Sequence, residues 1–135
     1  MAKYRVNVSL PPNWEQVPDE SRTYRRKGVA GGMLRISLNP PLPEGNPAVA
    51  ALAKALDEVE IDLGQEIRSF QGQTPMGPAA TSLRKSESRG LLQFWLVAGK
   101  VTVFASYTMG SLAEAQQDLA EAQQIVTGLR CVKVA

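Results

Sequence analysis

The sequence predicts an α+β protein, a three-layer α/β/α sandwich around a mainly antiparallel sheet. Several segments with the apolar pattern of strands follow one another as hairpins, and two segments with helical apolar spacing lie far apart in the chain. The strands of the clearest hairpin, 91–97 and 101–109, carry large apolar residues at both odd and even positions. Such strands need cover on both faces, so we expect one helix on each side of the sheet.

This hairpin is the strongest strand signal. In its first strand Leu92, Phe94 and Leu96 fall on one side, and three further apolar residues, Leu91, Trp95 and Val97, fall on the other. Ala98-Gly99-Lys100 joins the strands, and we expect Gly99 to supply the positive φ of a tight turn.

The first part of the chain predicts three strands. Apolar and polar residues alternate over 4–10, and Pro11-Pro12 ends that strand because proline has no N–H to donate. Residues 22–27 read as a short polar strand or edge, 28–32 (GVAGG) as a turn, and 33–38 as a strand with its leucines and Ile36 on one face. Trp14 is expected to fold back over the sheet edge with its indole N–H bonded to backbone.

The first predicted helix begins with Asn46 as N-cap and Pro47 at its first position. Its apolar stripe runs to Leu63, and Gly64 is the expected C-terminal cap. After it, 66–70 and 80–88 suggest strands around a turn at 74–78.

The second predicted helix begins at Ser111, which forms a capping box with Glu114. Its apolar side ends near Gly128 and comprises Leu112, Leu119, Ala122, Ile125, Val126 and Leu129.

Composition restricts the chemistry. The chain has 135 residues, 44% of them hydrophobic and 21% charged, so we expect a single domain over 1–135. It has no histidine and one cysteine, which excludes Ser-His-Asp and Cys-His catalysis and the familiar zinc sites. We therefore expect no catalytic residue, no cofactor and no metal, and a buried, inert thiol at Cys131.

The N-terminal residues lack the pattern of a secretory signal, and the apolar runs are too short to span a bilayer. We expect a cytoplasmic protein without membrane insertion, unless a signal peptide was removed.

Charge is divided unevenly along the chain. Residues 48–63 and 111–127 each carry a net charge of −3 while the whole chain carries +2, so the remainder carries +8. Basic strand residues could contact an anionic partner, or they could simply oppose edge-to-edge aggregation. The candidate partner contacts are Arg5, Arg25, Lys27 and Arg35.

Two further clusters have weaker interpretations. RTYRRKG, from residue 22, places an aromatic among cations as nucleic-acid contacts do, but no recognition motif surrounds it and the net charge is small. Nucleic acid is therefore not the expected partner. The carboxylates of Asp57, Glu58, Glu60 and Asp62 are expected to lie on a solvated helix face rather than at a metal.

Four segments in order carry a family resemblance: VSLPPNW (8–14), MLRISLNPPLPEG (33–45), QFWLVAGKVTVFASYTM (93–109) and the helix from Ser111. This layout resembles the PsbP-like superfamily, which includes PsbP, the Ran-binding Mog proteins and bacterial DcrB-related proteins. The resemblance implies an α/β/α sandwich. It also implies a non-enzymatic binding role, since some DcrB-related proteins are adaptor chaperones of type VI secretion effectors, and it carries over no site residue.

We expect a non-enzymatic protein-binding or adaptor module whose partner is another protein. The process is open, with secretion suggested by the DcrB-related proteins, and a homodimer is also left open. The alternative is a small-molecule-binding domain or a carboxylate-dependent enzyme with a cleft between sheet and helices. A nucleic-acid accessory role for Arg22 to Lys27 is a third hypothesis.

Overall fold

A computed structural model describes residues 3–27, 32–109 and 112–134. Within them, a seven-stranded antiparallel sheet has the order β2-β3-β4-β8-β7-β6-β5, and β1 and β9 form a separate antiparallel pair. The strands are β1 (Tyr4–Asn7), β2 (Trp14–Gln16), β3 (Thr23–Arg26), β4 (Met33–Asn39), β5 (Gln65–Thr74), β6 (Gly77–Ser86), β7 (Gly90–Val97), β8 (Thr102–Met109) and β9 (Arg130–Lys133). The helices are α1 (Ala48–Asp57) and α2 (Leu112–Thr127).

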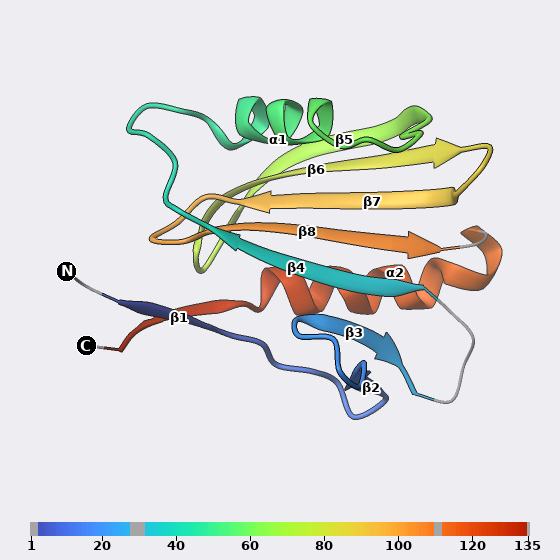
Figure 1. The fold of residues 1–135 in the computed structure, drawn as a ribbon, viewed down its shortest axis with the longest axis horizontal. Helices are drawn as coiled ribbons and strands as arrows, with labels where there is room; N and C mark the ends of the chain where they lie inside the picture. The colour runs from blue at the N-terminus through green and yellow to red at the C-terminus, as the bar shows by residue number, and fades with distance from the viewer. Residues whose placement is uncertain (1–2, 28–31, 110–111, 135) are drawn as a thin grey trace.

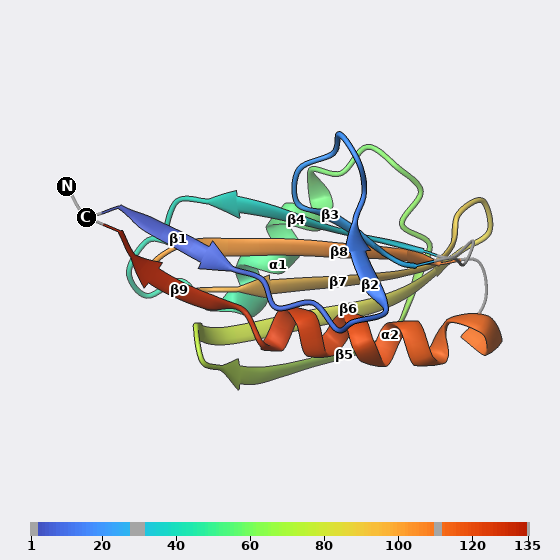
Figure 2. The ribbon, with the colours of Figure 1, turned by 90° about the horizontal axis from the view of Figure 1, so that it is seen from below.

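The two helices lie on opposite sides of the large sheet, as Figures 1 and 2 show together. One core contains Leu52 and Leu56 of α1 against Leu92, Phe94 and Leu96 of β7. The other core contains the apolar side of α2 and the opposite face of the sheet, including Trp95, Val103, Tyr107, Ala122 and Ile125. The predicted α+β sandwich with a mainly antiparallel sheet is therefore confirmed.

The central hairpin forms as predicted, with opposite faces of β7 in the two cores. The expected role of Gly99 is wrong, however, because its φ does not lie in the positive region. A side chain there would instead lie 2.6 Å from the carbonyl oxygen of Met76, in the neighbouring β5–β6 turn. Glycine is needed here for a close approach of two turns rather than for an unusual dihedral angle.

The first helix is shorter than predicted at both ends. Pro47 rather than Asn46 is the N-cap, no side chain caps the helix, and α1 ends at Asp57 instead of continuing to Leu63. After the end of α1, Asp62 holds a turn: its carboxylate accepts hydrogen bonds from the Gly64 N–H (2.9 Å) and the Ser86 hydroxyl (2.9 Å). Ile61 and Leu63 still reach the α1 core from this non-helical segment.

The N-terminal strand is shorter than predicted and lies outside the large sheet. Strand β1 ends at Asn7 and pairs with β9, a strand that the sequence pattern did not reveal. Val6, Val8 and Leu10 nevertheless pack on the α2 core. The turn expected at 28–32 falls largely, and the Ser111 capping box partly, outside the described residues. Within the described chain, neither helix is both long and apolar enough to cross a membrane.

Candidate functional site

A groove of about 830 Å³ lies between α2 and the β5–β6 edge of the sheet. We call it the α2–β5 groove. Apolar side chains make up most of its walls, and a second, narrow pocket beside it shares Phe70, Thr81 and Gln123. The lining residues are Ile67, Arg68, Phe70, Thr81, Leu83, Gln93, Leu119, Ala120 and Gln123.

Strand order explains why this groove is open. β5 is the last strand of the sheet, and no strand among the described residues pairs with its outer edge. Phe70 pairs with Thr81, which pairs with Trp95 of the α2 core, so Phe70 points to the α2 side. Neither of the two helices in the described ranges covers it there: Phe70 is 50% exposed and its neighbour Ile67, at a β-bulge, is 55% exposed. Two large apolar side chains on one edge form a site where a partner can be buried.

The floor of the groove contains two glutamine side chains, and each makes a hydrogen bond. The Gln93 side chain is buried, and its Nε2 donates to the carbonyl of Phe94 (3.2 Å). Gln123 of α2 accepts a hydrogen bond from the Trp95 indole N–H. These bonds hold the two amides in place, so the floor is pre-formed.

Among the described residues that line the groove, Arg68 is the one that carries a charge. It is exposed, and no ion pair or side-chain hydrogen bond engages it within the described part of the chain. Its neighbour Glu66 points to the other side of the sheet, where it accepts a hydrogen bond from Ser82 (2.7 Å). The groove therefore has an apolar wall with a free cation at its rim.

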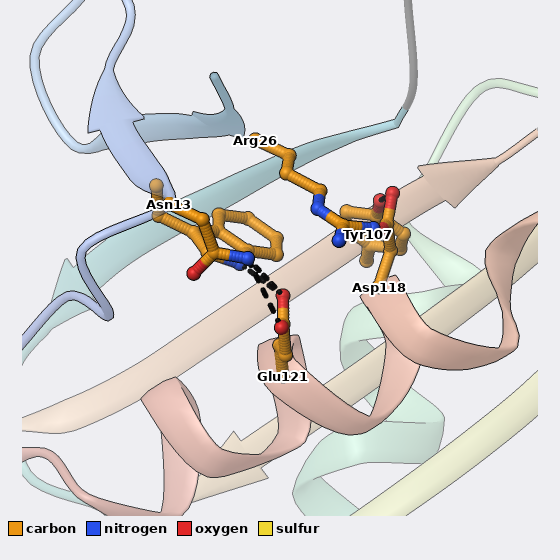
Figure 3. A network of polar contacts seen from close by, with 6 residues as sticks. Asn13, Arg26, Tyr107, Asp118 and Glu121 are labelled. Carbon is orange, nitrogen blue, oxygen red and sulfur yellow. Dashed lines mark hydrogen bonds and ion pairs between the residues drawn. The ribbon is translucent and has the colours of Figure 1, made fainter. Parts of the chain in front are cut away.

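The opposite side of α2 is closed by hydrogen bonds to the segment around β2 (Figure 3). The indole N–H of Trp14 donates to Glu121 Oε2 (2.7 Å), and the Asn13 amide donates to both oxygens of the same carboxylate (3.1 and 3.2 Å). Trp14 is only 3% exposed and its ring lies 6.1 Å from that of Tyr107. Trp14 lies at the sheet edge, on β2, as expected. The expected backbone partner of its indole N–H is wrong, because that N–H donates to a helix carboxylate.

A second carboxylate of α2 completes this closure, one turn earlier in the helix. Asp118 forms an ion pair with Arg26 of β3 (2.7 Å) and accepts a hydrogen bond from the Tyr107 hydroxyl (3.2 Å). Figure 3 shows these three side chains close together. Burial, followed by the negative charge of Asp118, raises the pKa of Tyr107 well above its ordinary value. We call Asn13, Trp14, Arg26, Tyr107, Asp118 and Glu121 the clamp network.

The clamp network shows that the helix charge has a structural use. Sequence analysis noted the net negative charge of 111–127 without assigning it a role, and the structure places two of its carboxylates in contacts: Asp118 is 5% exposed and Glu121 is half-buried. A sequence signal existed, since both carboxylates flank apolar positions of the helix and a buried tryptophan N–H needs an acceptor.

The four predicted contact residues do not form one cluster. Arg25 of β3 and Arg35 of β4 lie on the sheet face opposite α2, and exposed Lys27 follows β3 directly. Arg25 is already paired with Glu15 (2.8 Å), and Arg5 lies apart on β1, where it bonds to Asn7. Their role in binding stays a prediction.

The segment proposed for nucleic acid is also engaged internally. Arg25 and Arg26 both form ion pairs, and Tyr24 is buried with its pKa raised, chiefly by burial. An aromatic ring that faces the core cannot stack on a base.

The predicted acidic helix face is not one continuous surface, because only Asp57 of its carboxylates lies in α1. The bonds to Asp62 described above, with Ser86 contributing most and the Gly64 N–H next, lower its pKa. A search of the described residues finds no group of histidine, cysteine and carboxylate side chains that could hold a metal. Cys131 is a free, half-buried thiol on β9 rather than a fully buried one.

Sequence analysis missed the α2–β5 groove. Segment 66–70 suggested a strand, and its apolar residues would ordinarily belong to a core. Their exposure depends on β5 being the last strand of the sheet, which no local pattern in the sequence specifies.

Comparison with known proteins identifies the fold. No protein-family model matches the chain, and a search of curated proteins finds no match. Among solved structures, the chain is similar to LpqN of Mycobacterium tuberculosis, described as involved in cell envelope biogenesis (TM-score 0.59, 12% identity, 99% of this chain and 86% of that chain). It is equally similar to cyanobacterial PsbP from Synechocystis sp. PCC 6803 (TM-score 0.59, 9% identity, 98% and 94%). The chain therefore has a PsbP-like fold.

Proposed function

We propose that the protein is a non-enzymatic binding module of the adaptor type, and that it holds an apolar segment of another protein in the α2–β5 groove. The single observation that carries this proposal is the pair of half-exposed side chains, Ile67 and Phe70, on an edge strand beside an apolar groove. Burying such a surface against a partner is favourable by about 25 cal/mol for each Å² of apolar area.

The groove supports a binding role better than a catalytic one. Among the side chains that the structure describes, its lining includes no aspartate or glutamate, so the carboxylate-dependent enzyme considered from the sequence gains no support from this site. Gln93 and Gln123 make defined hydrogen bonds, and their amides cannot act as a general acid or base. The fold is compatible with this role: LpqN, which shares it, is described as involved in cell envelope biogenesis, and a function in the envelope or in secretion is part of the proposal.

A small apolar molecule is the second candidate occupant. The volume of about 830 Å³ falls within the range of ligand pockets, roughly 300–1,000 Å³. Enclosed ligand sites bury most of their ligand, whereas the α2–β5 groove is bordered by the free edge of β5. An extended or helical protein segment makes better use of an open border.

The test is affinity capture from the native host with matched variants. Phe70→Asp places a charge in the groove, and Ser37→Asp adds the same charge at an exposed position of β4 on the opposite sheet face. We expect the wild type and Ser37→Asp to recover the same protein, and Phe70→Asp to lose it while remaining folded by circular dichroism. Recovery of no protein at low salt, or recovery of the same protein by Phe70→Asp, would contradict the proposal. A small molecule found by mass spectrometry in place of a protein would favour the second candidate.

A further inference from the structure

We propose that β5 accepts an extended segment of the partner protein as an additional strand of the large sheet. The segment would place alternate apolar side chains over the α2–β5 groove and a carboxylate beside Arg68. This inference rests on the proposed function and specifies how the partner binds.

The edge of β5 has the length and exposure that strand addition requires. It spans ten residues, of which Gln65 to Gln73 are all exposed, and its outer edge is unpaired by any strand in the described ranges. Main-chain hydrogen bonds to such an edge provide affinity, and pockets for alternate side chains provide specificity. The opposite edge, β2, has only three residues and begins with buried Trp14.

Both faces of the β5–β6 hairpin have room for the side chains of an added strand. Successive side chains of a strand point to opposite faces of the sheet. On the α2 side they would meet the large apolar groove, and on the α1 side a smaller, more polar groove of about 350 Å³ lined by Leu56, Ser69 and Arg84. The segment therefore needs apolar residues at every second position and polar residues between them.

Charge decides between a foreign segment and a second copy of this chain. Arg68 is exposed without an ion-pair partner in the described residues, so a carboxylate on the added strand would complement it. A second β5 brings no such group to that face, because its one carboxylate, Glu66, faces the other side and bonds to Ser82. A second copy would instead add a second Arg68 to the same face.

The first experiment selects the segment. Random peptides displayed on phage are selected on the wild-type protein after counter-selection on Phe70→Thr, a variant that keeps a strand-forming residue on β5. We expect enriched peptides in which every second residue is apolar, with an aspartate or glutamate at one of the positions that face the groove, beside Arg68. Enrichment of no peptide, or of peptides without alternation, would overturn the proposal.

Matched variants locate the bound peptide. Phe70→Thr should weaken the selected peptide about tenfold or more, whereas Gln71→Thr, on the other face of the same strand, should leave its affinity within about twofold. Arg68→Glu should weaken it about tenfold, and a peptide with lysine in place of its carboxylate should recover that loss. Equal effects of Phe70→Thr and Gln71→Thr would contradict a site on the α2 side.

Backbone methylation separates strand addition from other binding modes. Two versions of the peptide carry N-methyl groups on alternate amides, one on the odd and one on the even positions. An added strand directs only one of these sets toward β5, so one version should lose binding and the other should retain it. If both versions bind, the partner is held in the groove without strand pairing, and the proposed function survives while this inference fails. A stable dimer of the free protein that Phe70→Thr dissociates would overturn it in favour of a second copy.

Discussion

The two edges of the large sheet differ in the contacts that they make with α2. At the β2–β3 edge, α2 contributes Asp118 and Glu121 to a network that buries an indole ring and an ion pair. At the β5 edge, the described side chains of the same helix that reach the wall of the open groove are Leu119, Ala120 and Gln123. One helix thus fixes one edge and leaves the other available, so mutations at the two edges should separate stability from binding.

Replacing the two edge aromatics should show the largest contrast. Trp14→Ala removes a buried ring and the N–H donor to Glu121, and we expect a loss of about 3–5 kcal/mol in the free energy of unfolding. Phe70→Ala removes a half-exposed ring and should cost about 1 kcal/mol. Urea unfolding followed by circular dichroism measures both. A similar cost for the two variants would show that the β5 edge is as structural as the β2 edge.

The buried carboxylate of the clamp network should have the next largest effect. Asp118→Asn leaves Arg26 without its ion-pair partner, and we expect a loss of about 3 kcal/mol, the low end for buried pairs because the Arg26 side chain is partly exposed. Asp57→Asn, an exposed carboxylate of α1, is the matched control and should change stability by about 0.5 kcal/mol or less. Equal unfolding midpoints for the two variants would rule out a stabilising role for the Arg26–Asp118 pair.

Two glycines compare the packing beside Tyr107 of the clamp network with the packing on β5. A methyl group at position 32 would overlap the Thr108 carbonyl oxygen and the Tyr107 ring, so Gly32→Ala should cost about 2 kcal/mol. At position 72, on β5, the nearest atom of Phe70 is 4.0 Å away, and Gly72→Ala should stabilise the protein by about 0.5 kcal/mol. Thermal unfolding distinguishes them, and a gain in stability for Gly32→Ala would contradict the close packing beside Tyr107.

Alkaline pH should destabilise the protein through the clamp network at the β2–β3 edge. The folded protein holds Tyr107 protonated at pH values where the unfolded chain has begun to lose that proton, because its pKa is raised by burial and by Asp118. Its contribution is complete below about pH 10 and is lost as pH rises toward the raised pKa, with a slope of about 1.4 kcal/mol per pH unit. The pKa of Tyr24 is also raised, so this residue contributes to the pH dependence in the same direction. Urea unfolding above pH 10 should therefore show a steeper decline for the wild type than for Tyr107→Phe, and identical slopes would refute this linkage.

Much of the fold follows from local pattern, whereas the site does not. The two-sided apolar run Leu91 to Val97 predicts a central strand, and the spacing of Ala122, Ile125 and Val126 predicts one buried face of α2. Elements with little apolar content of their own, such as β2 and β9, escape detection because they form only by pairing with distant strands. The extent of α1 was overestimated because Ile61 and Leu63 stay in contact with the core after the helix has ended.

Position in the sheet explains the missed groove. Phe70 and Phe94 are both apolar residues in strands, yet Phe94 lies in a central strand under α1 and Phe70 lies in an edge strand that no helix covers. Of the four basic residues, Arg25 and Arg35 lie on strands of the large sheet, Lys27 follows β3 and Arg5 lies on β1. The pairing of Arg25 with Glu15 depends on the β2–β3 register. Strand order and register are tertiary properties, which one sequence specifies only through long-range contacts.

Hydrogen–deuterium exchange with and without the selected peptide tests the central comparison most directly. We predict new protection in residues 65–74 and 119–123, which border the α2–β5 groove, and unchanged exchange in residues 13–27. Protection confined to 13–27, or to the sheet face that carries Arg25 and Arg35, would contradict it.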